Sequence, residues 1–364
     1  MPDNKTSPFS PSGRVYVLGA GASVFAGYPL ATRLQSFVRD FQTLEHGTKQ
    51  VASRIFDKLS EAEVLFSKYV VRDPNGVANL EDLLTYLELY HTFPGKMFDL
   101  DPWNSADSAA VRRVVTEKFL DYQWDLNKVT WGSGKAVERV AADPKRVCAI
   151  SDAWAKMINP GDVIITFNWD ILHELILWRA KLWSYRDGYG FECGRQGKRD
   201  TLTRTLMLKL HGSVNWVQED DSTAVTEIAH VADFFVGSKD WDQRSHYSQA
   251  QTDSGRKLIL PTYLKDISSN KTLLELWTKS HRLLSQAKEL IVVGYRLNRV
   301  DHPARLLFGT ALTENTTLNE VTVVSPGPTE WGEFLFRLEK QTINVRQTFE
   351  DWVCAATISR PDSC

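Results

Sequence analysis

The sequence is poor in cysteine and has no excess of charge of either sign. Its 364 residues include four cysteines (Cys148, Cys193, Cys354 and Cys364), and no two of them form a C-x-x-C pair. This spacing excludes a zinc site built from neighbouring cysteines and does not favour a disulfide-bonded scaffold. Lys and Arg total 43 against 45 Asp and Glu, a formal net charge of −2. Nucleic-acid-binding proteins typically show a basic excess or a basic block, so we expect no direct contact with nucleic acid.

Other absences narrow the class of protein further. No run of eighteen apolar residues occurs, and residues 1–8 lack the apolar core of a secretion signal, so we expect a cytoplasmic protein without membrane contact. The motifs G-x-x-x-x-G-K-[ST], G-x-S-x-G and H-E-x-x-H are also missing. Their absence argues against a P-loop NTPase, an α/β-hydrolase and a zinc metalloprotease. We expect no bound metal.

The apolar residues that are present predict alternating strands and helices. Short runs rich in β-branched residues, at 14–18, 162–166, 205–210, 290–294 and 320–324, predict buried strands, the last of which ends the sheet. Apolar residues at helical spacing follow most of these runs. The alternation predicts an α/β fold, with a Rossmann-like parallel sheet and helices on both faces.

The remaining segments predict the domain organisation. Residues 45–158 show helical spacing and little strand character, which predicts a helical insertion into one domain that spans residues 14–325. Residues 1–13 are rich in Pro, Ser and Asn and are expected to be flexible. Residues 219–257 are polar and indicate a long surface excursion. Residues 326–364 are expected to be a short tail packed on the domain.

Four predicted strands end in small or polar residues, and the first of these strand ends is Leu18-Gly19-Ala20-Gly21-Ala22-Ser23. Ligands of parallel sheets bind outside the carboxyl ends of the strands, and glycines there let the backbone approach a phosphate. Val24 stands where the dinucleotide fingerprint G-x-G-x-x-G needs its third glycine, and the acidic ribose ligand expected about twenty residues on is missing. These departures from the fingerprint argue against the interpretation that the protein is a hydride-transfer dehydrogenase. A tight connection without a ligand is the alternative.

Three further strand ends carry polar or small residues. Asn168 and Asp170 follow the second strand, where the alternative roles are a helix N-cap and a first-turn acid. His211 follows the third, and the ordinary histidine pKa suits proton transfer near neutrality; a merely structural histidine is the alternative. The other seven histidines, His173 among them, are expected to be structural. Gly294 follows an apolar run and either permits close backbone approach or only forms a turn.

The order of these motifs resembles the sirtuin superfamily, and specifically the bacterial sirtuin-like NAD hydrolases of anti-phage defence. The series is Gly-Ala-Gly-Ala-Ser at 19–23 with Gly27-Tyr28-Pro29, Thr-x-Asn-x-Asp at 166–170, Leu-His-Gly-Ser at 210–213, and Val-Gly-Tyr at 293–295 with Asp301. The resemblance spans residues 14–325. It implies a sheet that holds NAD as a substrate, which is cleaved to nicotinamide and ADP-ribose.

The resemblance also implies roles for individual residues. Asn168 is expected to contact the nicotinamide ribose or a water molecule, and His211 to act as a base on the ribose hydroxyls or that water. The residues implied to surround NAD are Gly19, Ala20, Gly21, Ala22, Ser23, Thr166, Asp170, Gly212, Gly294, Tyr295, Asp301 and Ser325. Within this set the first glycine turn is expected to cradle the pyrophosphate. Gly294, Tyr295 and Ser325 are expected to line the adenosine side.

The sequence also departs from the deacetylating sirtuins. Gly27-Tyr28-Pro29 is followed by Leu30-Ala31-Thr32-Arg33 and not by Asp-Phe-Arg, and the cysteines cannot build the four-cysteine zinc module that shapes the acyl-lysine cleft. The resemblance therefore implies that this protein shares the NAD site of the sirtuins but not their acyl-peptide site. A non-catalytic nucleotide-binding subunit of a defence complex, or a protein deacylase, is the alternative. Because an unregulated NAD hydrolase would kill its host, we expect a homo-oligomer and a co-encoded regulator such as a HerA-type ATPase.

Overall fold

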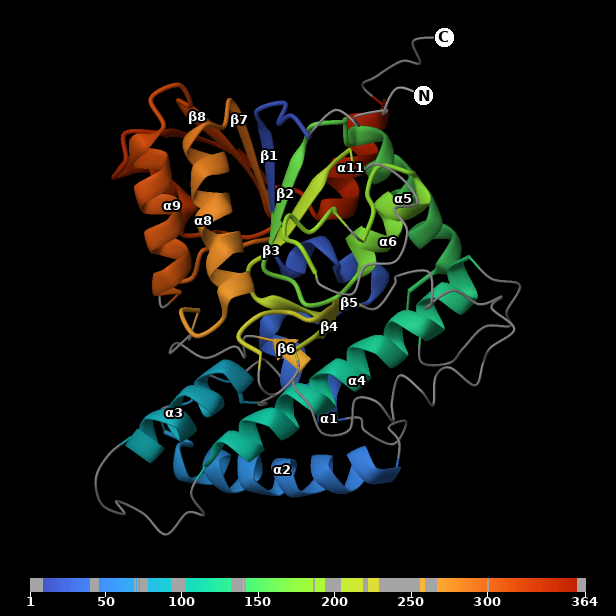
Figure 1. Ribbon diagram of the computed structural model, residues 1–364, viewed down its shortest axis with the longest axis vertical. Helices are drawn as coiled ribbons and strands as arrows, with labels where there is room; N and C mark the ends of the chain where they lie inside the picture. The colour runs from blue at the N-terminus through green and yellow to red at the C-terminus, as the bar shows by residue number, and fades with distance from the viewer. Residues whose placement is uncertain are drawn as a thin grey trace.

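A parallel sheet lies at the centre of the computed structural model (Figure 1). The structure describes residues 9–39, 46–68, 70, 72, 78–92, 103–131, 140, 142–185, 187–193, 204–218, 222–228, 256–258, 267–299 and 301–358. The six strands of the sheet are β1 (Arg14–Leu18), β2 (Val163–Thr166), β3 (Leu206–Lys209), β7 (Glu289–Val293), β8 (Glu320–Val324) and β9 (Gln341–Val345). The α/β fold predicted from the sequence is confirmed.

The strand order of this sheet is β3-β2-β1-β7-β8-β9, and every neighbouring pair is parallel. In chain order the six strands therefore run 3-2-1-4-5-6, which is the Rossmann arrangement. The order reverses between β1 and β7. In such sheets the crevice outside the carboxyl ends of these two strands is the usual ligand site.

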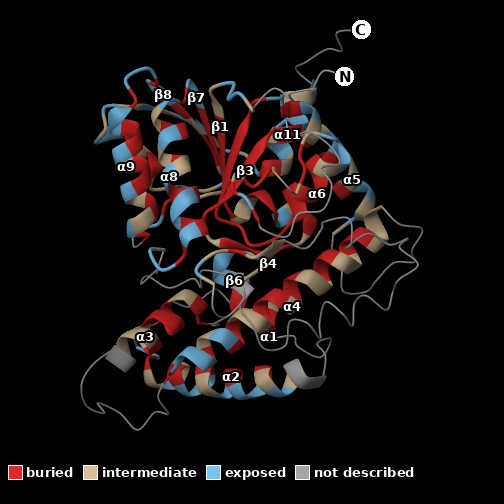
Figure 2. Cartoon of the chain, in the orientation of Figure 1, coloured by how far each residue is buried: buried red, intermediate tan, exposed pale blue. Residues whose placement is uncertain are grey.

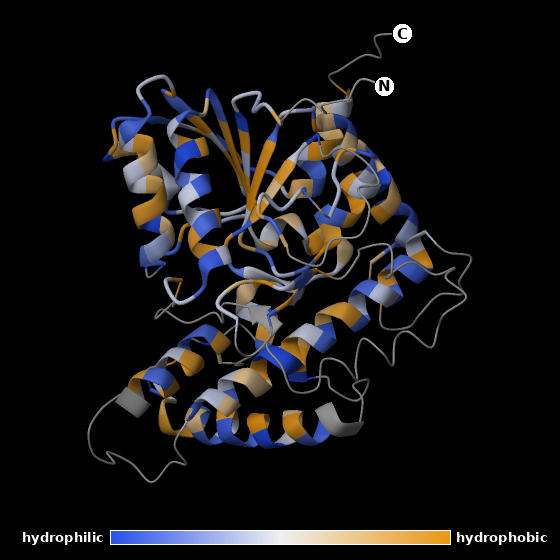
Figure 3. Cartoon of the chain, in the orientation of Figure 1, coloured by the Kyte–Doolittle hydropathy of each residue, from blue (hydrophilic) through white to orange (hydrophobic). Residues whose placement is uncertain are grey.

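Helices cover both faces of the sheet (Figure 1). On one side lie α8 (Lys271–Ser285) and α9 (His302–Glu314), which pack against each other. On the other lie α5 (Pro144–Met157), α6 (Leu172–Arg179) and α11 (Phe349–Ile358), with α5 in contact with both of its neighbours. Figure 2 shows that the strands β1, β2 and β3 are buried, while α8 and α9 alternate between buried and exposed residues. Figure 3 shows apolar residues along the same strands. This pattern explains the nearly continuous apolar composition of the strands.

A helical region lies beyond the carboxyl end of the sheet (Figure 1). It contains α2 (His46–Leu65), α3 (Leu80–Thr92) and α4 (Ser105–Thr130), and the short helix α1 (Leu34–Arg39) joins it to the glycine turn. A reciprocal capping box between Asn104 and Asp107 starts α4. The Tyr122 hydroxyl of α4 donates to the carbonyl oxygen of Ala26 at 2.9 Å, so the helical region is tied to the segment after β1.

A second, smaller sheet follows β3. It is antiparallel, in the order β5-β4-β6, and consists of β4 (Gly212–Val217), β5 (Glu227–Ile228) and β6 (Arg256–Leu258). Most of the polar stretch 219–257 lies outside the described residues, so the predicted surface excursion stays a prediction. No helix among the described segments is long and apolar enough to cross a membrane.

The prediction that 320–324 is the last strand is wrong. The segment after it forms α10 (Trp331–Phe336), β9 and α11, and β9 pairs with β8 as the edge strand of the sheet. The apolar pattern missed β9 because its sequence is Gln-Thr-Ile-Asn-Val and its side chains are largely exposed. Helix α11 is part of the core, since the buried Phe349 ring packs against Phe25 at 5.2 Å and Trp154 at 5.3 Å.

Candidate functional site at the carboxyl ends of the strands

The strand ends selected from the sequence meet at one edge of the sheet. Leu18 pairs with Thr166 on one side and with Val293 on the other, and Thr166 pairs with Lys209. The residues that follow β1, β2, β3 and β7 therefore lie in a row. The strand order reverses between β1 and β7, so the two glycine turns stand at the position expected for a ligand, and the motifs with Asn168 and His211 follow the next two strands.

The two glycine turns at this edge contact each other directly. Gly19 N donates to Val293 O at 3.0 Å, and Gly21 N donates to Gly294 O at 3.1 Å. Gly294 has a φ of 64°, and a Cβ atom there would lie 2.6 Å from Ala22 N. A Cβ on Gly19 would lie 2.6 Å from Gly294 O. Both glycines are thus required by the close approach of two backbones.

The N–H groups of the first glycine turn are largely used within the protein. Besides the bonds of Gly19 and Gly21, Ala22 N donates to Gly19 O at 2.9 Å and Ser23 N donates to Ala20 O at 3.1 Å. The prediction that this turn binds the pyrophosphate is therefore supported by the position of the turn at the crevice. It is not supported by a set of N–H groups free to bind a ligand. It stays a prediction.

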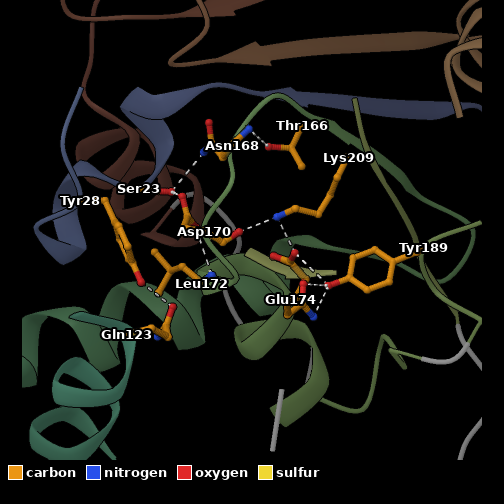
Figure 4. Close-up of polar contacts among 11 residues, drawn as sticks. Ser23, Tyr28, Gln123, Thr166, Asn168, Asp170, Leu172, Glu174, Tyr189 and Lys209 are labelled. Atoms are coloured by element: carbon orange, nitrogen blue, oxygen red, sulfur yellow. Dashed lines mark hydrogen bonds and ion pairs between the residues drawn. The ribbon is translucent and has the colours of Figure 1, made fainter. Parts of the chain in front are cut away.

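Asn168 is tied to this turn through its side chain. Its Nδ2 donates to Gly19 O at 3.0 Å and to Ser23 Oγ at 3.2 Å, while Asn168 N donates to Thr166 Oγ1 at 3.1 Å. The alternative role as an N-cap is wrong, because α6 begins after Ile171 and Asn168 makes no bond to it. The amide oxygen of Asn168 points away from Ser23 (Figure 4). The carboxamide therefore offers an acceptor on that side.

The alternative role of Asp170 as a first-turn acid is wrong, because Asp170 precedes α6 and the acid in the first turn of that helix is Glu174. The Asp170 carboxylate instead makes two hydrogen bonds beside the start of the helix. Its Oδ1 accepts from Leu172 N at 3.1 Å at the start of α6, and its Oδ2 accepts from Ser23 Oγ at 3.0 Å (Figure 4). Ser23, Asn168 and Asp170 are all buried. These side chains, which the resemblance places around NAD, are therefore bonded to one another.

A chain of buried polar side chains continues behind Asp170 (Figure 4). Lys209 Nζ donates to Asp170 O at 2.5 Å and to Glu174 Oε1 at 2.6 Å. The Tyr189 hydroxyl donates to Glu174 Oε1 at 3.3 Å and accepts from Asn215 Nδ2 at 3.0 Å. Burial raises the pKa of Glu174, and the positive charge of Lys209 opposes this shift. The sequence analysis did not predict this series of hydrogen-bonded side chains. The available signal was Lys209, a charged residue within an apolar strand, which needs a buried partner.

His211 follows β3, the strand next to the one that Asn168 follows, and packs against an aromatic ring. Its imidazole and the Phe167 ring are in a T-shaped arrangement with centroids 5.0 Å apart, and Phe167 stacks on Tyr295 at 4.2 Å with an interplanar angle of 3°. Tyr295 donates through its hydroxyl to Asp301 Oδ2 at 3.0 Å, and burial, with the nearby carboxylate, raises the Tyr295 pKa well above its ordinary value. Phe167 is thus a site residue that the sequence analysis did not select.

Asn168 and His211 therefore stand at neighbouring strand ends but contact different groups. Asn168 bonds to the glycine turn, and His211 packs on Phe167 beside Tyr295. That both side chains face one cavity stays a prediction.

The remaining predicted residues lie at the same edge. Gly212 has a φ of 78° and begins β4, and Ser325 N donates to Val345 O where β8 ends. The half-buried members of the predicted set are Ala20, Gly21, His211, Gly294, Tyr295 and Ser325. The other members are buried, and Asn168 among them keeps 8% of its surface exposed.

Two other features of the described residues bear on metal and ligand binding. Within the part of the chain that the structure describes, no three His, Cys, Asp or Glu side chains gather as metal ligands would. A cavity of about 390 Å³ lies between α2 and the start of α4, where its lining includes Arg54, Lys58 and Asp107. Lys58 and Asp107 are paired there at 3.0 Å, so these charges are already matched.

Comparison with known proteins adds little to this geometry. No protein-family model matches the chain, and no curated protein matches it. Similar solved structures include the crystal structure of a Sir2 homolog–NAD complex, with 13% identity and a TM-score of 0.42 over 95% of this chain and 88% of that one. Another is Sir2 in complex with the inhibitor EX-527, 2'-O-acetyl-ADP-ribose and deacetylated p53 peptide, with 14% identity and a TM-score of 0.37 over 95% and 93%. At such values the assignment of a Rossmann-like fold rests on the strand order itself.

Proposed function

We propose that the protein binds NAD at the carboxyl edge of the sheet and hydrolyses it to nicotinamide and ADP-ribose. The observation that carries the proposal is the bond from Asn168 Nδ2 to Gly19 O, which joins the candidate catalytic amide to the glycine turn at the strand-order reversal. The half-buried residues along this edge supply a surface that a dinucleotide can reach. The order of the four sequence motifs supports NAD as that dinucleotide.

The chemistry follows from the two candidate catalytic side chains. When the bond between nicotinamide and ribose breaks, positive charge develops on the ribose and nicotinamide leaves as a neutral molecule. Asn168 Oδ1 would accept from a ribose hydroxyl or a water molecule and hold it in place. The oxygen of that water forms the new bond to the ribose carbon, and neutral His211 takes its proton. In this scheme Asn168 orients the ribose hydroxyl or the water molecule, and His211 accepts the proton of the water.

The test is nicotinamide release by the purified protein. Because a positioned general base contributes roughly 100- to 10,000-fold, His211→Ala is expected to lower the rate by at least about 100-fold. Asn168→Ala is expected to have a similar effect. His302→Ala is the matched control, since His302 is exposed at the start of α9. NAD binding without release would favour the nucleotide-binding subunit, and release that depends on an acylated peptide would favour the deacylase.

We further propose that assembly with further copies or with a co-encoded protein regulates the activity, as part of an anti-phage response. This part of the proposal rests on the harm that unregulated NAD hydrolysis would cause. The assay is therefore run on the isolated chain and with the products of neighbouring genes. Equal rates in every combination would refute regulation by assembly and would leave the hydrolase proposal intact.

A further inference from the structure

We propose that Lys209 is a positioning residue, whose ammonium group holds the loop that carries Asn168 in register with the strand end that carries His211. The inference rests on the proposed function and names a residue that would act through others. Lys209 lies at the end of β3, two residues before His211, and its Nζ reaches across to the carbonyl oxygen of Asp170, two residues after Asn168. One side chain thus connects both candidate catalytic segments.

The same ammonium group is anchored on its other side by α6. Glu174 Oε1 accepts from Lys209 Nζ at 2.6 Å, and the Lys209 and Glu174 side chains are 0% and 1% exposed. Tyr189 and Asn215 extend this anchor into the segment before β3 and into β4. Lys209 therefore has little freedom to move, and its position determines that of the Asp170 carbonyl.

Stability alone does not explain this pair. Desolvating two charges is costly, and replacing a buried ion pair by apolar side chains of similar size is often neutral or stabilising. The alternative benefit of such a pair is a defined geometry. Since Lys209 is wholly buried beneath the edge, it acts through the loop and not by touching NAD.

The experiment compares two doubly substituted proteins. Lys209→Met/Glu174→Gln removes both charges and the bond to Asp170 O together. Arg14→Met/Asp162→Asn is the matched control, because Arg14 and Asp162 form an ion pair of the same length, 2.6 Å, at the opposite ends of the strands. A displacement of about 1 Å at a catalytic group can cost 100-fold, so kcat of the first protein is expected to fall about 100-fold with KM changed less than about threefold. The kcat of the control protein is expected to stay within about twofold of the wild-type value, because its substitutions lie far from the reacting groups.

Hydrogen exchange of the folded proteins provides a readout that does not need turnover. Amides of residues 167–171 are expected to exchange at least about tenfold faster in the Lys209 protein than in the wild type, and at the wild-type rate in the control, because the loop opens locally. If the wild type releases no nicotinamide, the hydrolase proposal fails. The exchange rates at residues 167–171 then still test whether Lys209 positions the loop, because they do not depend on turnover. A folded Lys209 protein with kcat within threefold of the wild type, or with unchanged exchange at 167–171, overturns it.

A milder variant covers the case in which the double substitution does not fold. Glu174→Gln keeps Lys209 and its bond to Asp170 O but weakens the anchor from a charged to a neutral acceptor. Its kcat is expected to fall about three- to tenfold, since about 1 kcal/mol of loop stabilisation is a factor of about five. Unchanged kcat together with unchanged exchange at 167–171 in this variant would also overturn the proposal.

Discussion

The Nδ2 atom of Asn168 lies 3.2 Å from the Oγ atom of Ser23, although 144 residues separate the two in the chain. Ser23 in turn donates to Asp170 at 3.0 Å. The glycine turn after β1 and the polar loop after β2 are therefore one bonded unit. Its geometry orients the Asn168 amide so that the oxygen faces away from Ser23 (Figure 4).

Asn168→Asp tests this orientation. The carboxylate has the shape of the amide but no donors, so it would set an acceptor against Gly19 O and add a charge close to Asp170. An unsatisfied buried group costs about 1–3 kcal/mol, and the loss of unfolding free energy is expected in that range, measured by urea denaturation. Asn344→Asp on the exposed face of β9 is the control, for which a change below about 0.5 kcal/mol is expected. Equal losses in the two variants would contradict the assigned bonds.

Gly294→Ala tests the contact between the two glycine turns. The substitution combines a positive φ with a Cβ atom 2.6 Å from backbone atoms of the first turn, so a loss of about 2–4 kcal/mol of unfolding free energy is expected. The control is Gly332→Ala in α10, where no heavy atom lies within 4 Å of the added Cβ and a helical alanine is favoured by about 0.5–1 kcal/mol. Differential scanning calorimetry should show shifts of opposite sign.

His173→Phe tests the acid sensitivity of the core. His173 is buried against Trp154 and Phe349, and burial lowers its pKa from 6.5 to about 4. A depressed histidine pKa stabilises the fold above pH 6.5, and this contribution is lost as pH falls from 6.5 towards 4. Between pH 7.5 and 5 the wild type is expected to lose about 2 kcal/mol more unfolding free energy than the variant. His281→Gln, at a partly exposed position, should retain the wild-type loss.

Phe349→Ala tests whether the C-terminal segment belongs to the core. Truncating a buried phenylalanine costs about 3–5 kcal/mol, and the loss of packing on Phe25 should loosen the glycine turn as well. Phe336→Ala removes the same group from a residue that is 81% exposed, and we expect a change of less than about 0.5 kcal/mol. The two values come from equilibrium urea unfolding. A small loss at Phe349 would restore the simpler description of this segment as a tail.

The strands and motifs of the site were largely predictable, and the reasons are local. Each buried strand of a parallel sheet needs apolar side chains on both faces, so the runs at 14–18 and 290–294 stood out. The helix that begins at Pro144 follows Asp143, whose side chain accepts from Lys145 N, which is also a local signal. Strand β9 was missed because its stability comes from backbone pairing with β8, which leaves no apolar pattern in its side chains.

The sequence by itself determined the alternation of strands and helices, the glycine turns, and the candidate residues Asn168 and His211, because these follow from short-range patterns of burial and backbone freedom. Tertiary structure alone decided which strand ends became neighbours, the direction of the Asn168 amide, and the buried pairing of Lys209 with Glu174. Those relationships join residues 35 to 149 positions apart. Strand order and the exclusion of water bring such residues together, and neither leaves a pattern in adjacent residues.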